Sequence, residues 1–404
     1  MFTNIKITDF KSCQETTLDG LGPVTVLVGR NGAGKSNILQ AIEWLASVGS
    51  YQPQFIAPHR NSHNVAAEFE VDGVEYRYSA SVIWSRDKSA ATPEPGISIR
   101  ERLDFLDSRW QQILSRTDEI ITVEGRSEPI KINQTATCLP SLFALLPKDD
   151  PLLSRIRPVV SFLSSVRYYT LDEPTVSRSE AEERIISQAS YVWWQSNLDD
   201  SGRPMDDVQR TLLNLHLEAP EKFDELKSLL GCNGLGLFDE ILVESVVVGT
   251  GPFQKSDELP NTIHFLEFVP CAAKTAASFA YYELSHGTRR ILRMVVSLFF
   301  DNALVMLIEH PEDGIHSGLL KKLMHLLHEY SVPAQEIITS HSTELFNVLD
   351  PADVRLVSMT DGTTIVRPLS SIELVAATQY VSSDGPLSDF LETVQDDYSS
   401  RGIE

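Results

Sequence analysis

Hydrophobic positions recur with two different periods along the chain, and the changes of period divide it into three parts and a tail. Residues 1–96 carry apolar runs and alternating positions that predict strands, with one helix over 35–48. Residues 97–235 mostly carry apolar positions three and four apart between charges, which predicts a mainly helical insertion. Strand patterns return over 236–370, and 371–404 is an acidic tail with little apolar surface, which we expect to be loosely held.

The individual strand and helix predictions are specific. Asp72-Gly73 separates two alternating segments, which predicts a hairpin of 65–71 with 74–82. Apolar runs predict further strands over 2–10, 24–28, 240–248, 262–269, 303–308, 336–339 and 354–359. The clearest helical periods in the insertion cover 180–194 and 206–230. This mixture predicts an α/β fold in which strands from both ends of the chain form a mixed sheet with flanking helices.

Composition and charge narrow the class of protein. The chain has 404 residues, of which 42% are hydrophobic and 22% charged, as in ordinary globular proteins. Its net charge of −22 argues against a surface covered with nucleic-acid contacts, although it leaves room for a local basic groove. No leading segment resembles a signal peptide, and the apolar region 291–308 is interrupted by polar residues, so we expect no membrane span. Four widely spaced cysteines predict reduced thiols in a cytoplasmic protein. They are Cys13, Cys138, Cys232 and Cys271.

A phosphate-binding motif provides the first chemistry. The segment from Gly29 to Ser36 reads GRNGAGKS and matches GxxxxGK[ST] in full, with an apolar strand before it and a helix after it. Glycines let the backbone N–H groups turn around phosphate oxygens, and the helix N-terminus adds partial positive charge. We expect Lys35 to neutralise the β- and γ-phosphates of ATP and the Ser36 hydroxyl to bind Mg²⁺. The predicted nucleotide contacts in this segment are Asn31, Gly32, Ala33, Gly34, Lys35, Ser36 and Asn37.

A second group of polar residues lies some 250 residues further on. The segment 284–290 reads LSHGTRR and opens an apolar helix, where Ser285 is placed to cap free N–H groups. Glu309 follows the apolar run 303–308, where a Mg²⁺-binding carboxylate belongs, and His341 closely follows the apolar strand at 336–339. Residues that follow parallel strands meet at one edge of the sheet, which is where α/β proteins bind ligands.

The order of these motifs resembles that of the ABC-type ATPase heads of SMC proteins, RecF and OLD-like ATPases, including anti-phage ATPases such as the Septu subunit PtuA. The resemblance implies a split ATPase head that works as a dimer with ATP and Mg²⁺. It assigns Lys11 and Ser12, in the opening DFKS segment, to the nucleotide phosphates. In the partner's site, the signature residues Ser285, His286 and Gly287 would contact the γ-phosphate. Glu309, with Ser36, would hold Mg²⁺, and His341 matches the switch histidine.

One position departs from the family pattern. A second carboxylate normally follows the metal-binding one and positions or deprotonates the attacking water, but His310 occupies that place here. Glu312 is the next carboxylate and lies beyond Pro311. Because a neutral imidazole can accept a proton, turnover with His310 as base stays open, beside slow or absent hydrolysis with ATP acting as a clamp.

Two functions remain open on the sequence alone. The first is an ATP-gated sensor or scaffold subunit of a bacterial anti-phage system, partnered with a separate nuclease, because the chain itself carries no nuclease motif. The second is a RecF-like DNA-repair clamp, for which DNA would be the partner. A transporter ATPase fits the motifs less well. The expected assembly is a homodimer through the heads, with higher oligomers an option through the insertion.

Overall fold

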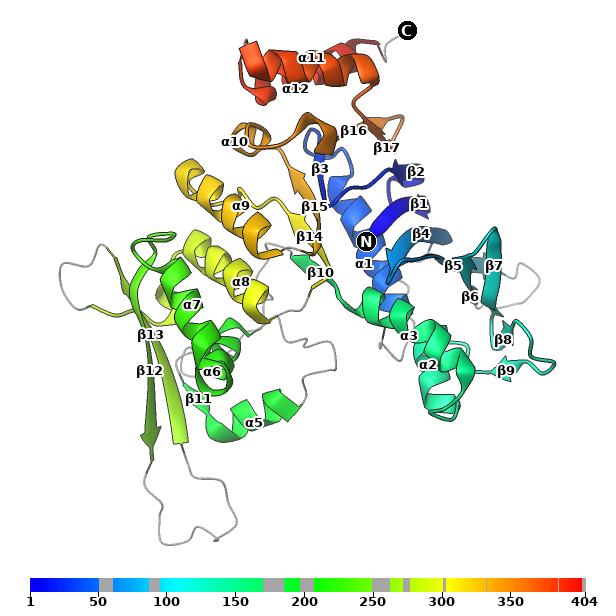
Figure 1. Cartoon of the computed structure of the whole chain (residues 1–404), viewed down its shortest axis with the longest axis horizontal. Coiled ribbons are helices and arrows are strands. Elements are labelled where there is room, and N and C mark those ends of the chain that lie inside the picture. The colour runs from blue at the N-terminus through cyan, green and yellow to red at the C-terminus, as the bar shows by residue number, and fades with distance from the viewer. Residues whose placement is uncertain are drawn as a thin grey trace, which may run out of the picture. The chain divides into compact units, whose positions relative to one another are not determined.

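The chain folds into two units (Figure 1). The computed structural model describes residues 1–50, 61–86, 95–169, 185–196, 207–248, 262–271, 277–300, 303–331, 333–383 and 385–401. The first unit comprises Met1–Tyr169, Ala303–His310 and Pro333–Glu404, and the second comprises Thr170–Asn302 and Pro311–Val332. The first unit is therefore assembled from both ends of the sequence, as a split head requires.

A six-stranded sheet forms the centre of the first unit. Its strands, in spatial order, are β10 (Val166–Tyr169), β14 (Val305–Glu309), β15 (Gln335–Ser340), β3 (Val24–Val28), β16 (Val354–Thr360) and β17 (Thr363–Pro368). All neighbours are parallel except β16 and β17. The strands predicted over 24–28, 303–308, 336–339 and 354–359 are confirmed to within two residues. Every residue of β15 is buried, the polar side chains that flank Ile337 and Ile338 included.

An antiparallel sheet forms the second layer of this unit. It runs in the order β2 (Cys13–Asp19), β1 (Phe2–Phe10), β4 (His63–Val71), β5 (Val74–Arg86), β6 (Pro95–Leu106), β7 (Trp110–Thr117), β8 (Ile120–Val123) and β9 (Ile130–Lys131). The hairpin predicted at Asp72-Gly73 is confirmed, and both turn residues have positive φ. Helix α1 (Lys35–Gly49) packs against strands of both sheets, so it is apolar around most of its circumference.

Four strands occupy the region that the periodicity predicted to be helical. Strands β6 to β9 lie within 95–131, so the helical prediction for 97–235 was wrong over its first quarter. In β6 the inward positions include Ile99, Glu101 and Leu103, all nearly inaccessible to solvent. The buried carboxylate at Glu101 breaks the alternation of apolar and polar residues that identifies a strand.

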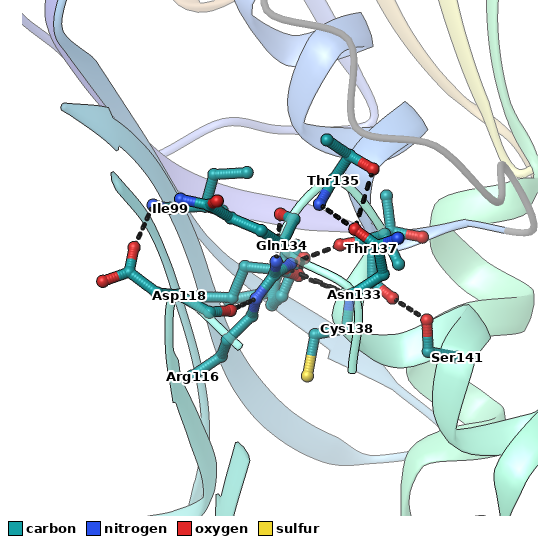
Figure 2. A network of polar contacts seen from close by, with 12 residues as sticks. Ile99, Arg116, Asp118, Asn133, Gln134, Thr135, Thr137, Cys138 and Ser141 are labelled. Atoms are coloured by element: carbon teal, nitrogen blue, oxygen red, sulfur yellow. Dashed lines mark hydrogen bonds and ion pairs between the residues drawn. The ribbon is translucent and has the colours of Figure 1, made fainter. Parts of the chain in front are cut away.

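Glu101 is buried because a second buried charge lies beside it. The Arg116 guanidinium, on β7, donates to the Glu101 carboxylate at 2.6 Å, and both side chains are fully inaccessible to solvent. Burial raises the pKa of the Tyr78 phenol, which stays protonated and donates to Glu101 at 2.5 Å. Arg116 also donates to the backbone carbonyls of Asp118, Gln134 and Ala136. Figure 2 shows this network around Arg116. This network ties the antiparallel sheet to the segment that leads into α2 (Cys138–Leu145).

We expect Arg116→Met to destabilise the protein by about 3–5 kcal/mol, because it leaves the Glu101 carboxylate buried without its cation. Urea unfolding followed by circular dichroism measures the shift. Lys6→Met, at the exposed Lys6–Glu15 pair, is the matched control and should change stability by about 0.5 kcal/mol or less. The pair Arg116→Met with Glu101→Leu should recover most of the loss. Equal urea midpoints for Arg116→Met and Lys6→Met would contradict this role for the buried pair.

The second unit combines helices with a small sheet. Its described residues form the helices α5 (Gln188–Ser196), α6 (Val208–Glu218), α7 (Pro220–Leu230), α8 (His286–Phe300) and α9 (Ser317–Ser331), with a 3₁₀ turn at Tyr281–Glu283. Strands β11 (Ile186–Ser187), β13 (Thr262–Pro270) and β12 (Phe238–Val247) form its antiparallel sheet in that order. Helices α6, α7 and α9 all pack on α8, whose apolar face supplies the centre of this unit. The helix predicted over 180–194 begins outside the described residues. In its described part the prediction was wrong for Ile186–Ser187, which form β11, and the helix α5 begins at Gln188.

The cysteines differ from the expectation. Cys232, after α7, and Cys271, after β13, form a disulfide with a Cα–Cα distance of 5.5 Å. The prediction of four reduced thiols was therefore wrong for this pair, because folding of the second unit brings together residues 39 positions apart. Cys13 and Cys138 are free and buried, and burial raises the pKa of both thiols.

The acidic tail forms helices rather than a loose segment. Helix α11 (Ser371–Ser383) is followed by α12 (Leu387–Arg401), which buries Leu387 and Leu391. The Ser388 N–H donates to the Asn347 side chain at 3.0 Å, just beyond α10 (Thr343–Phe346). A 3₁₀ turn at Pro351–Asp353 and helix α3 (Pro151–Ser164) complete the described elements of the first unit. Among the described residues, no helix combines the length and the apolar character that a membrane crossing needs.

Candidate nucleotide-binding site

The phosphate-binding loop is shaped by glycines that no larger residue could replace. Gly32 and Gly34 have φ of 81° and 98°, in the left-handed region, and Gly34 caps α1. A Cβ on Gly34 would lie 1.9 Å from the Thr364 hydroxyl oxygen, and one on Gly29 would lie 2.1 Å from the Val357 carbonyl oxygen. The loop is therefore pressed against β16 and β17.

Lys35 is held inside this loop. Its side chain is nearly buried, and its ammonium group donates to the Gly29 carbonyl at 2.7 Å and to the Arg30 carbonyl at 3.2 Å. The first turn of α1 carries no acidic residue, so the positive end of the helix dipole is available for an anion. These residues fit the phosphates of a nucleotide. The oxygens of Ser36 and Glu309 are of the kind that Mg²⁺ prefers.

The turn between β1 and β2 brings the predicted Lys11 and Ser12 to the same place. Lys11 has a φ of 54° and donates to Gln40 on α1. The Asn37 amide, also on α1, donates to the Ser12 hydroxyl oxygen at 2.7 Å. Lys11, Ser12 and Asn37 therefore gather at the first turns of α1.

Thr364 supports the loop and was not predicted from the sequence. It is fully buried on β17, and its hydroxyl donates to the Ala33 carbonyl at 3.1 Å while lying 2.7 Å from the Ser12 hydroxyl. One assignment of protons satisfies this series of hydrogen bonds: Asn37 donates to Ser12, Ser12 donates to Thr364, and Thr364 donates to the Ala33 carbonyl. These hydrogen bonds hold the phosphate-binding loop against the turn at Asp9–Ser12.

We expect Thr364→Val to weaken nucleotide binding about three- to tenfold, because it removes two hydrogen bonds and leaves the Ala33 carbonyl without a donor. Calorimetric titration with ATP and Mg²⁺ measures the change. Thr364→Ser keeps the hydroxyl and should bind as the wild type does. Thr363→Val, at the next position of β17, is the control, and an equal loss in both valine variants would remove Thr364 from this role.

The carboxyl ends of three parallel strands form the edge that faces this loop. In the sheet, Glu309 on β14 pairs with Thr339, and Ser340 on β15 pairs with Val28 on β3. Glu309, His341 and Gly29 therefore follow neighbouring strands at the same edge, as predicted.

Tyr168 is a second residue that the sequence did not reveal. It lies on β10, and its phenol donates to the Glu309 carboxylate at 2.5 Å. Burial, and then the hydrogen bond to Glu309, raise the pKa of Tyr168 well above its usual value. The phenol therefore remains a donor and fixes the orientation of the predicted metal-binding carboxylate.

His310 and His341 lie side by side. Their Nδ1 atoms are 3.2 Å apart, His310 being half-buried and His341 exposed. His310 has a φ of 44°, a strained conformation for a residue with a side chain, and its N–H donates to the Thr339 carbonyl at 3.0 Å. Strain of this kind concentrates at functional sites. The structure thus brings together the two predicted histidines at the sheet edge.

The signature segment lies in the second unit. The Ser285 hydroxyl oxygen accepts the Thr288 N–H at 3.2 Å and so caps α8, as predicted. A Cβ on Gly287 would lie 2.2 Å from the Gly314 carbonyl oxygen, so only glycine fits there. Ser285 and His286 are exposed. The segment therefore presents a capped helix N-terminus at the surface of this unit.

Comparison with known proteins places the chain among ATPases. The family described as "AAA domain, putative AbiEii toxin, Type IV TA system" matches residues 24–347. The chain belongs to this family. The match includes the phosphate-binding loop, the signature segment and both strand-end histidines, so the predicted membership in the ABC, SMC and RecF group of ATPases is confirmed.

Individual similar proteins match shorter stretches or at low identity. The DNA replication and repair protein RecF of Leptospira biflexa is 27% identical over 128 residues, 31% of this chain and 35% of that protein. The Old nuclease of Escherichia phage P2 is 37% identical over 71 residues, 18% of this chain and 12% of the nuclease. The SMC head domain from Thermotoga maritima is 15% identical, with a TM-score of 0.43 over 91% of this chain and 99% of that chain. The chain thus spans about a third of the RecF relative and less of the nuclease.

Proposed function

We propose that this chain binds ATP and Mg²⁺ in the first unit and closes into a homodimer when ATP is bound. Lys35 and the loop N–H groups hold the phosphates, while Ser36 and Glu309 hold Mg²⁺. The exposed, capped signature segment at Ser285 supports the dimer most directly, because an N-terminus of this kind suits a γ-phosphate held by the partner copy. ATP then links two chains through their sites.

We further propose that hydrolysis is slow and that the ATP-bound dimer is the working state. His310 takes the place of the carboxylate that would activate water, and its Nδ1 lies 3.2 Å from the Nδ1 of His341. A protein that closes with ATP and opens slowly suits a sensor or scaffold. This supports an ATP-gated subunit of a bacterial anti-phage system, with a separate nuclease as effector.

Three observations favour defence over repair. The family description includes a putative toxin of a toxin–antitoxin system, and one relative is a phage nuclease. The net charge of −22 opposes a broad DNA-binding surface. The RecF-like DNA clamp is the second candidate and rests on the similarity to RecF. Fluorescence anisotropy with duplex DNA at physiological salt separates them, since ATP-dependent DNA binding by the purified protein would favour the clamp. A nuclease encoded by the neighbouring gene would favour defence.

Dimer closure is tested by Ser285→Arg. We expect a non-hydrolysable ATP analogue to double the mass of the wild type in light scattering and to leave the variant monomeric, because the arginine fills the place of the partner's γ-phosphate. Ser154→Arg introduces the same side chain at an exposed position of α3 and should dimerise normally. If higher assemblies form, the comparison is made on the nucleotide-dependent step alone. Dimers of the same mass in both variants would reject the signature contact.

A further inference from the structure

We propose that His310 and His341 together chelate a divalent cation of the Zn²⁺ class through their Nδ1 atoms. This ion is distinct from the Mg²⁺ that accompanies ATP. The inference concerns the same sheet edge as the proposed function, but it does not require that ATP bind there.

The geometry of the two rings is that of a chelating pair. Histidine nitrogens bind Zn²⁺ at about 2.0–2.1 Å in tetrahedral sites, which places two ligand nitrogens about 3.3–3.4 Å apart. The Nδ1 atoms of His310 and His341 are 3.2 Å apart, and the ring centroids are 5.0 Å apart. An ion therefore needs only a small outward movement of the rings.

The backbone holds this pair in place without the ion. Strands β14 and β15 are parallel neighbours, and His310 and His341 follow their last residues. The His310 N–H donates to the Thr339 carbonyl at 3.0 Å, one strand away. Because the strand ends are fixed against each other, ordering the ligands costs little conformational entropy.

The chemistry of the donors selects the ion. Imidazole nitrogens suit Zn²⁺, Co²⁺, Ni²⁺ and Cu²⁺, whereas Mg²⁺ takes oxygen ligands and keeps several waters. His341 is exposed and His310 half-buried, so an ion can enter from solvent and water can complete its coordination. A neutral imidazole has a single lone pair, which the ion would occupy. His310 could then not accept a proton from water, and the bound ion would hold the site in a state that does not hydrolyse ATP.

The direct test is a titration of the metal-free, nucleotide-free full chain with Zn²⁺ by calorimetry, and with Co²⁺ by visible absorption. We expect one ion per chain and a Co²⁺ spectrum of nitrogen and oxygen ligands. His310→Ala and His341→Ala should each weaken binding about tenfold or more, since even the loss of an outer-shell partner costs 10–100-fold. His341→Asn, a milder change, should give the same loss if alanine at either position disturbs folding.

Two controls separate this site from others. His325→Ala, on the exposed face of α9, should bind Zn²⁺ as the wild type does, and Lys35→Ala should do so even though it loses ATP. If ATP binding fails, the metal proposal is therefore unaffected. If metal binding fails, the proposed ATP binding is likewise unaffected. The proposal is overturned if the wild type takes up no stoichiometric ion, if binding survives both histidine variants, or if Co²⁺ shows intense thiolate charge-transfer bands.

Discussion

His310→Glu is expected to raise the steady-state ATPase rate about 10²–10⁴-fold, the contribution that a positioned general base usually makes. The substitution places a carboxylate directly after Glu309, the place that the second carboxylate has in the resembling motif. The backbone there is held by the hydrogen bond from the His310 N–H to the Thr339 carbonyl. Its φ of 44° lies in the left-handed region, which histidine adopts more readily than glutamate, so the substitution adds a small amount of backbone strain.

The matched control for this experiment is His310→Gln, which has the length of glutamate without the charge. It should leave the rate at the slow wild-type level, and His310→Ala should do the same. His341→Ala should have little further effect on an enzyme that is already slow. The contrary result is a wild type that turns over several ATP per second and loses this activity in His310→Ala. His310 would then be a working base, and the clamp account would have to be abandoned.

The sequence was enough to locate the phosphate-binding loop and the strand-end residues, because their geometry is set locally. Eight contiguous residues define the loop, and the apolar segments before Gly29, Glu309 and His341 predict parallel strands. Residues that follow such strands must meet at one edge. Those predictions needed no knowledge of the tertiary structure.

The supporting residues could not be found this way because their partners are distant in the sequence. Thr364 bonds Ser12 across 352 positions, and Tyr168 bonds Glu309 across 141. Neither residue belongs to a recognisable motif, and each acts only through a neighbouring strand. The disulfide of Cys232 with Cys271 has the same origin, since it depends on how the second unit folds.

Two other predictions, for β6 and for the acidic tail, were wrong because one or a few residues changed the hydrophobic pattern. Glu101 places a charge at an inward position of β6, and its buried partner Arg116 lies on another strand. The alternation is lost in the sequence, although the strand is well formed. In the tail, a few apolar residues are enough to hold α12, among them Leu387 and Leu391. Composition averages over such positions, so it predicted a loose segment.

Binding of ATP by wild type and Lys35→Ala, measured by calorimetry with Mg²⁺, tests the central claim most directly. Lys35 lies buried in the loop, and charged hydrogen bonds contribute about 1.5–3 kcal/mol each, so losing its contacts to two phosphates should weaken binding about 100-fold or more. Lys131→Ala, on β9, provides the control and should bind as the wild type does. The account predicts saturable binding in the wild type and the control and none in Lys35→Ala at the same concentrations. Equal affinity in all three proteins would contradict it.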